Sequence, residues 1–263
     1  MRCGSPWPQS AISAQAVQHA REQRRGLVGA LRSILGNMRL RNVVRRIGPV
    51  ERVFWWRAAF YDSNLIRAFD IVRPYTMLSG GQLHNAVQAV RYVDEKRIEG
   101  AMVECGVWRG GCSALMAWVG RPREMWLFDS FEGLPEPGSL DGLEAKDYAG
   151  KVIASENDVR EVLTKLGVTG TIRKGWFETT VPVASGEIGR IAILRLDGDW
   201  YESTKACLDN LYDLVAPGGV VIVDDYDRWQ GCRAAVDEFM AQRGIVPQLR
   251  RISAGGGRDF IKP

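Results

Sequence analysis

The sequence predicts an α/β fold built on a doubly wound, mostly parallel seven-stranded sheet with a helical N-terminal extension. From about residue 100 onward, short apolar runs alternate with segments of helical periodicity, which is typical of repeated strand–helix units. Acidic or glycine-rich turns follow several of these apolar runs. Before residue 74 the pattern is helical and rich in arginine. These observations favour one large domain preceded in the sequence by a basic extension.

Length and composition narrow the class of protein. The 263-residue chain can form one large domain with an appendage, and its 46% hydrophobic and 25% charged content is ordinary for a soluble globular protein. No apolar run approaches the roughly 18 residues that a membrane span needs. The five cysteines form no CxxC pair, so we expect reduced thiols in the cytoplasm rather than disulfides or zinc. With only two histidines, a histidine base is not expected.

The net charge of +4 is distributed unevenly. Residues 1–60 hold eleven arginines, no lysine and two glutamates, a local charge of +9 that leaves −5 for the remainder. We expect residues 1–20 to be poorly ordered and residues 21–73 to form the basic helical extension. Packing of this extension within a homo-oligomer, a dimer or tetramer, is the preferred interpretation. The alternatives are that the extension binds a membrane face or an anionic substrate, or that it is a transit segment. No base-reading motif supports binding of nucleic acid.

The domain expected over residues 74–263 contains the strand–helix alternation. Strands are expected at residues 101–104, 124–128, 169–173, 188–196, 219–223, 248–252 and 258–261. Helices are expected at residues 53–72, 81–96, 113–119, 155–166, 203–214 and 231–243. Ligands of such sheets bind outside the carboxyl ends of the strands, so the polar residues at those ends are the candidates for function.

The residues at the ends of the first three expected strands favour binding of a nucleoside that carries a positive charge. Glu104 begins a glycine-rich turn spaced GxxxGG, which does not match the dinucleotide fingerprint and would repel a pyrophosphate. Asp129 follows the second strand, where a carboxylate can accept hydrogen bonds from both ribose hydroxyls; a helix N-cap is the alternative. Trp176 follows the third strand and either packs on an adenine ring or belongs to the core.

Four carboxylates follow the fourth and fifth strands. They are Asp197, Asp199, Asp224 and Asp225. Neighbouring strands would bring them to one edge of the sheet, where so many anions repel each other unless a cation lies between them. Oxygen ligands of this kind suit Mg²⁺, with Ca²⁺ or Mn²⁺ as alternatives. The competing interpretation is a set of helix caps and surface acids.

Several ordered motifs resemble one known family. VECGVWRGG, FDSFEGLPEP, LRLDGDWYEST and GGVVIVDDYDRWQG, with PYTM upstream, resemble the macrocin/mycinamicin O-methyltransferase family (TylF/MycF type) over residues 74–243. The resemblance implies a class I methyltransferase fold, which is Rossmann-like, with S-adenosylmethionine and Mg²⁺. It also implies methylation of a sugar hydroxyl on a small-molecule glycoside such as a macrolide or aminocoumarin, by an oligomeric enzyme.

The resemblance also implies roles for individual residues. The implied metal ligands are Asp197, Asp224 and Asp225, and Asp199 is the implied general base, or Asp197 if the ligand set shifts. The residues expected to bind the cofactor are Met77, Ser79, Glu104, Gly106, Trp108, Arg109, Asp129, Phe131, Lys174, Gly175 and Trp176.

The acceptor side is less defined by the sequence. Residues 134–150, rich in Pro, Gly and acids, are expected to form a mobile lid. The aromatic residues expected to form the walls of the acceptor site are Trp200, Tyr201, Tyr226 and Trp229. Three alternatives stay open: a catechol-type acceptor, a metal-dependent glycosyltransferase that uses the DxD of residues 197–199, and a binding scaffold without activity.

Deleting residues 1–50 should lower the oligomeric state and weaken activity, while S-adenosylmethionine binding by the remaining domain persists. The reason is that the acidic body offers a complementary surface, which a symmetric oligomer would use reciprocally. Light scattering on the truncated protein measures the change. An unchanged mass would instead favour a membrane or the acceptor as the partner of this charge.

Overall fold

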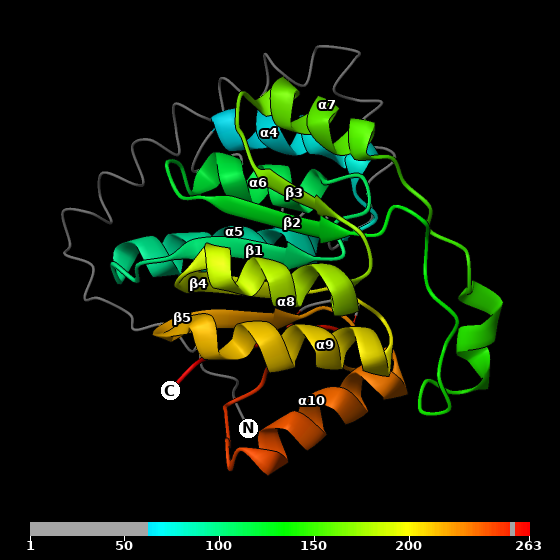
Figure 1. Ribbon diagram of the computed structural model, residues 1–263. Helices are drawn as coiled ribbons and strands as arrows, with labels where there is room; N and C mark the ends of the chain where they lie inside the picture. Colours follow the sequence, from blue (N-terminus) through cyan, green and yellow to red (C-terminus); the bar gives the residue numbers. More distant parts are fainter. Residues whose placement is uncertain (1–62, 253–255) are drawn as a thin grey trace, which may run out of the picture. The chain divides into compact units, whose positions relative to one another are not determined.

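The computed structural model describes residues 63–252 and 256–263, and these form the predicted seven-stranded sheet (Figure 1). The strand order is β3-β2-β1-β4-β5-β7-β6. The parallel strands are β1 (Ala101–Cys105), β2 (Met125–Asp129), β3 (Thr171–Lys174), β4 (Ile191–Leu196) and β5 (Val215–Val223). At the far edge, β7 (Arg258–Ile261) runs antiparallel to both β5 and β6 (Arg250–Arg251). The doubly wound, mostly parallel sheet is confirmed.

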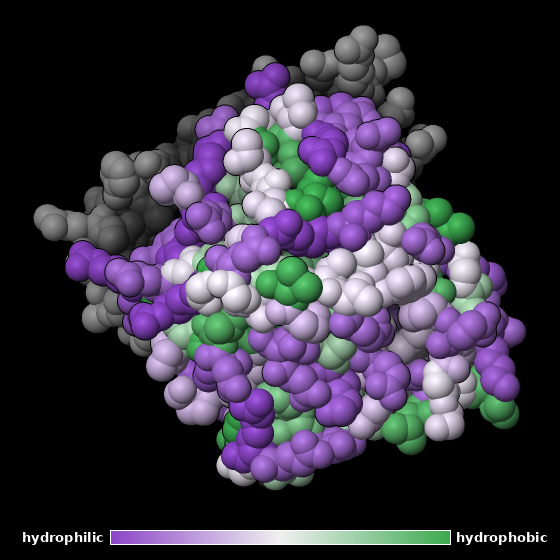
Figure 2. All heavy atoms as spheres, in the orientation of Figure 1, coloured by the Kyte–Doolittle hydropathy of each residue, from purple (hydrophilic) through white to green (hydrophobic). Residues whose placement is uncertain are grey.

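Helices cover both faces of this sheet. One face carries α4 (Ser63–Val72), α5 (Gly80–Glu95), α6 (Gly111–Val119) and α7 (Glu156–Leu166). The other carries α8 (Phe177–Ile188), α9 (Tyr201–Leu211) and α10 (Gln230–Gln242), which lie in front in Figure 1. Short 3₁₀ helices are η1 (Arg73–Tyr75), η2 (Leu143–Tyr148) and η3 (Tyr212–Leu214). The outward side of the front helices is largely hydrophilic (Figure 2), as amphipathic helices on a sheet require.

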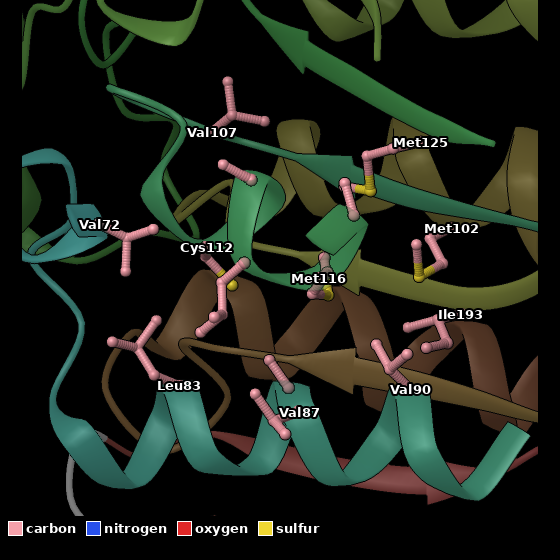
Figure 3. Packing of buried hydrophobic residues seen from close by; sticks show 14 of the residues in the cluster. Val72, Leu83, Val87, Val90, Met102, Val107, Cys112, Met116, Met125 and Ile193 are labelled. Carbon is pink, nitrogen blue, oxygen red and sulfur yellow. The ribbon is translucent and has the colours of Figure 1, made fainter. Parts of the chain in front are cut away.

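Successive side chains along each strand point to opposite faces of the sheet, and this divides the core into two layers. On β1, Met102 packs toward α5 and α6, whereas Val103 packs toward the helices of the opposite face. Figure 3 shows Val90 of α5 lying against Met102 and Ile193. Fully burying side chains of this kind contributes about 1.5–3 kcal/mol each. The carboxyl ends of β1, β4 and β5 are thereby fixed side by side.

Expectations for the first part of the chain are only partly within the described residues. The disorder expected for residues 1–20 and the extension up to residue 62 lie outside them. The helix expected over residues 53–72 is present as α4 over Ser63–Val72, and its apolar side, including Phe69, belongs to the same core as α5 and α6. No helix of the described residues is long and apolar enough to cross a membrane.

The structure corrects two local expectations. Helix α8 was not predicted, because its β-branched residues and Pro182 argue against a helix. Its buried residues Val181, Ala184 and Ile188 nonetheless have helical spacing, and packing on the sheet outweighs the propensities. Strand β5 starts at Val215 rather than residue 219, with a register shift that accommodates the Pro–Gly–Gly segment within the strand.

The turn after β1 approaches the chain after β4 so closely that only glycine fits at position 106. Gly106 has φ +89°, and a Cβ there would lie 1.8 Å from the backbone oxygen of Asp197. Gly186 in α8 has open space around it instead.

Replacing Gly106 with alanine should therefore destabilise the fold by about 3 kcal/mol or more, from left-handed strain and backbone overlap. The matched change Gly186→Ala should stabilise it by about 0.5–1 kcal/mol, because alanine favours a helix interior. Urea unfolding of both variants measures the difference through the transition midpoint. A Gly106→Ala midpoint equal to that of the wild type would contradict this close approach.

Candidate active site

A cavity of about 450 Å³ opens at the carboxyl ends of the parallel strands. It has the size of a small-molecule site. The predicted residues that line it are Met77, Glu104, Gly106, Trp108, Asp129, Gly175, Trp176, Asp197, Asp199, Asp224, Asp225 and Trp229. The predicted residues that do not line it are Ser79, Arg109, Phe131, Lys174, Trp200, Tyr201 and Tyr226. The sheet thus brings all of the predicted acids into one cavity.

A buried arginine lies at the centre of these acids. Arg195 on β4 has only 2% of its side chain exposed. Its guanidinium pairs with three carboxylates: Nη1 with Glu104 Oε1 at 2.5 Å and Asp197 Oδ2 at 2.8 Å, and Nη2 with Asp224 Oδ1 at 2.7 Å. Because β4 lies between β1 and β5, a cation on β4 reaches acids at both neighbouring strand ends. Sequence reasoning missed Arg195; the available signal was an arginine between two leucines of a buried strand.

Glu104 is engaged within the protein. Its Oε1 pairs with Arg195, and its Oε2 accepts a hydrogen bond from the Ser113 hydroxyl at the start of α6. Burial raises the pKa of Glu104, and the charge of Arg195 opposes that rise. The carboxylate therefore ties β1 to β4 and α6 at the floor of the cavity.

Asp129 organises the glycine-rich turn. Its Oδ2 accepts hydrogen bonds from the backbone N–H groups of Val107 (2.9 Å) and Trp108 (2.8 Å), and its Oδ1 accepts one from Phe131 (2.8 Å). Burial raises the pKa of Asp129, and these three bonds oppose the rise. No helix starts directly after Asp129, so the N-cap alternative is wrong. A carboxylate has about four acceptor positions, which leaves capacity for a ligand hydroxyl.

Three of the rim acids lie close enough to share a cation. Asp197, Asp199 and Asp225 each offer an oxygen, and these atoms lie within 4.8 Å of one another. Oδ2 of Asp225 is buried without a hydrogen-bond donor among the described residues. Burial, then repulsion from Asp197, raises the pKa of Asp199 to about 7. Such a group of oxygens, one of them unsatisfied, fits a hard divalent cation.

Asp224 lies beside this group with different partners. Besides its ion pair with Arg195, its Oδ2 accepts a hydrogen bond from Gln82 Nε2 at 2.8 Å. Gln82 also forms the capping box of α5 with Ser79, which explains why Ser79 serves the helix rather than the cavity. Burial raises the pKa of Asp224 to about 7, against the opposing charge of Arg195.

Other predicted cofactor residues hold the walls in place. Arg109 forms an ion pair with Asp158 (2.9 Å) and stacks on Tyr75, with 5.1 Å from its Cζ to the ring centroid. Phe131 is buried and has φ +59° in the turn after Asp129. These residues shape the cavity from outside its lining.

Most of the predicted acceptor-site aromatic residues point elsewhere. Trp200 is buried and donates its indole N–H to the backbone oxygen of Pro135. The hydroxyls of Tyr201 and Tyr226 donate to acids on α10. Trp229 lines the cavity and donates its indole N–H to Asp199 Oδ1 at 2.8 Å.

Residues 134–150 form a long loop beside the cavity, drawn in green at the right of Figure 1. We call this stretch the lid segment. It contributes Leu134, Pro135 and Tyr148 to the lining, none of which was predicted as a site residue. Its outer surface exposes Leu140 and Leu143, the latter to 83%.

Comparison with known proteins identifies the family. Residues 58–257 match the family described as Macrocin-O-methyltransferase (TylF). The chain is 34% identical over 230 residues to the 8-demethyl-8-(2,3-dimethoxy-alpha-L-rhamnosyl)-tetracenomycin-C 4'-O-methyltransferase of Streptomyces olivaceus, covering 82% of this chain and 87% of that protein. It is 39% identical over 195 residues to the demethyldecarbamoylnovobiocin O-methyltransferase of Streptomyces niveus, covering 69% and 74%.

A solved structure agrees with these sequence matches. The O-methyltransferase NovP superposes with a TM-score of 0.66 at 36% identity, covering 72% of this chain and 82% of NovP. The class I methyltransferase fold expected from the motifs is therefore confirmed. The chain belongs to the macrocin O-methyltransferase (TylF) family and is an S-adenosylmethionine-dependent O-methyltransferase.

Proposed function

We propose that this enzyme methylates a sugar hydroxyl of a natural-product glycoside and that it requires a divalent ion, Mg²⁺, to do so. The observation that carries the proposal is the group of Asp197, Asp199 and Asp225 beside the turn held by Asp129. The two relatives named above are O-methyltransferases named for a rhamnosyl-tetracenomycin and for demethyldecarbamoylnovobiocin. Their names support a glycoside as the acceptor.

The methyl donor belongs, in this proposal, at the turn after β1. The remaining acceptor capacity of Asp129 suits a ribose hydroxyl, and Trp176 is available to the adenine ring. The cationic sulfonium end suits a floor rich in carboxylates. This assignment uses the predicted residues that line the cavity, and it does not use Ser79, Arg109, Phe131 and Lys174, which lie outside the lining.

Asp199 and Asp225, with Asp197 next to them, would hold the metal. The expected ligand set of Asp197, Asp224 and Asp225 is shifted here toward Asp199, because Asp224 is already paired with Arg195 and Gln82. Bound there, Mg²⁺ would supply Lewis acidity that makes an acceptor hydroxyl easier to deprotonate before methyl transfer.

Asp197 is then the better candidate to receive the proton of the acceptor hydroxyl. Its side chain is 26% exposed, and Arg195 fixes its Oδ2 at 2.8 Å. A base held in one orientation beside its substrate meets the geometric condition for proton transfer. Asp199, bound to Trp229 and grouped with Asp225, would serve the metal instead.

A catechol is the second acceptor class, since its vicinal hydroxyls chelate a metal in the same way as a sugar diol. Family membership removes the glycosyltransferase and scaffold alternatives, because the chain is an O-methyltransferase. We further propose a homo-oligomer in the cytoplasm. The buried free thiols Cys105, Cys112, Cys207 and Cys232 accord with a reducing compartment.

Replacing Asp129 with alanine should weaken S-adenosylmethionine binding at least tenfold. The change removes a charged acceptor, and hydrogen bonds to charged groups are worth about 1.5–3 kcal/mol each. Calorimetric titration measures the affinity. Asp209→Ala, at an exposed aspartate of α9, is the matched control and should bind within twofold of the wild type. Unaltered affinity in Asp129→Ala would mean that the ribose binds elsewhere.

Methyl transfer from labelled S-adenosylmethionine should occur with deoxysugar glycosides and should depend on a divalent ion. We expect chelation by EDTA to abolish transfer and Mg²⁺ to restore it, because the rim acids alone do not acidify a sugar hydroxyl. Asp225→Asn should lower turnover at least a hundredfold, with S-adenosylmethionine affinity within a few-fold of the wild type.

The control for this assay is Asp209→Asn, at the exposed aspartate of α9 whose ion-pair partner is Lys205, and it should keep wild-type turnover. Full activity in EDTA would refute the metal requirement. Transfer confined to the catechols of the same acceptor panel would refute the sugar assignment and leave the metal requirement standing.

A further inference from the structure

A carboxylate of the lid segment is buried where the lid meets the helices. Asp141 is 2% exposed. Its Oδ1 accepts a hydrogen bond from the backbone N–H of Tyr201 at 2.7 Å, and its Oδ2 accepts one from Gly138 at 2.7 Å. Since Trp200, the N-cap residue of α9, makes no side-chain cap, Asp141 supplies the cap of that helix from 60 residues away.

The start of α10 is shaped around the same carboxylate. A Cβ at Gly231 would lie 1.8 Å from Asp141 Oδ1, so a side chain at position 231 would displace Asp141. Gln230 donates through Nε2 to the backbone oxygen of Leu140 at 3.0 Å. Asp141 therefore fixes the lid segment to the first turn of α9 and lies against the first turn of α10, where Gln230 holds the neighbouring Leu140.

A chain of contacts leads from this anchor to the metal-binding group. Trp200 donates to Pro135 O of the lid segment at 2.9 Å. The ring of Trp229 packs edge-to-face between Trp200 (5.0 Å between centroids) and Tyr148 of the lid segment (5.1 Å). The indole N–H of Trp229 then donates to Asp199 Oδ1.

Asp199 needs such support because its backbone is strained. It has φ +58°, in the left-handed region that residues with side chains rarely adopt. Trp200, the next residue, donates its N–H to Gly198 O at 2.6 Å, which closes the turn around Asp199. Strain of this kind persists where the surrounding contacts determine the conformation.

We propose that Asp141 is a positioning residue: by anchoring the lid segment to α9 and α10, it holds Trp229 against Asp199 and so keeps Asp199 in place for the divalent ion. The inference rests on the proposed metal site. It links the lid segment to the affinity for metal, so that release of the lid lowers this affinity. A residue that merely capped α9 would affect the stability of the fold and leave metal affinity unchanged.

The test measures Mn²⁺ binding by the full chain with S-adenosylhomocysteine present, by calorimetric titration. Asp141→Ala should weaken Mn²⁺ binding at least tenfold, and Asp141→Asn should lie between it and the wild type, since one acceptor oxygen remains. Trp229→Phe keeps an aromatic ring but removes the donor to Asp199, and it should weaken binding at least threefold. The double variant Asp141→Ala/Trp229→Phe should lose less than the product of the two single losses, because both act through one contact.

Two controls separate positioning from charge and from stability. Asp147→Asn removes the same charge from an exposed position of the lid segment and should bind Mn²⁺ like the wild type. Ser155→Ala removes another side-chain helix cap, that of α7, and should lower the melting temperature without changing Mn²⁺ affinity. S-adenosylhomocysteine affinity within threefold of the wild type reports an intact fold in each variant.

The outcomes distinguish the two proposals. Wild-type protein that binds no Mn²⁺ overturns the proposed metal site and this inference with it. Wild-type protein that binds Mn²⁺, with Asp141→Ala and Trp229→Phe binding equally well, overturns the positioning role alone. If Asp141→Ala does not fold, Asp141→Asn and Trp229→Phe decide the question, since affinities equal to the wild type in both contradict the inference.

Discussion

The active site depends on one buried guanidinium that neutralises acids from neighbouring strands. Desolvating Glu104 and Asp224 without Arg195 between them would leave uncompensated charge in the interior, which is strongly unfavourable. With Arg195 in place, the same residues fix the spacing of β1, β4 and β5 at their carboxyl ends. The arginine also orients Asp197, so Glu104 on β1 and the acids after β4 and β5 share one ion-pair partner.

This anchor assigns different tasks to carboxylates that look alike in the sequence. Acids paired with Arg195 have a fixed direction, whereas Asp199 and Asp225 keep oxygens that no arginine or lysine engages in the residues the structure describes. A site that combines engaged and unengaged carboxylates can offer the unengaged oxygens to an external cation while the engaged ones hold the site together. The arrangement also explains why a glutamate can be buried at the floor of the cavity: its carboxylate is paired with Arg195.

The sequence was sufficient for the sheet and for the position of the acids, because both follow from local periodicity and from the rule that strand ends meet at one edge. It was not sufficient for the partners of those acids. Arg195 pairs with Glu104 across 91 residues, and no local pattern encodes this contact. Two tryptophans illustrate the same limit, since Trp200 turns into the core and Trp229 faces the cavity, although both follow acids at the strand ends within a few residues. Helix α8 was missed because packing outweighed local propensity there.

The exposed leucines of the lid segment and the residues of the cavity floor differ in how many contacts a substitution would disturb. The catalytic floor is built from residues that each hold several neighbours, so a change there disturbs many contacts at once. About half of the surface of Leu140 and most of the surface of Leu143 are exposed to solvent. Substitutions at these two positions would therefore change the outer surface of the lid segment and leave the ion pairs and hydrogen bonds of the floor intact.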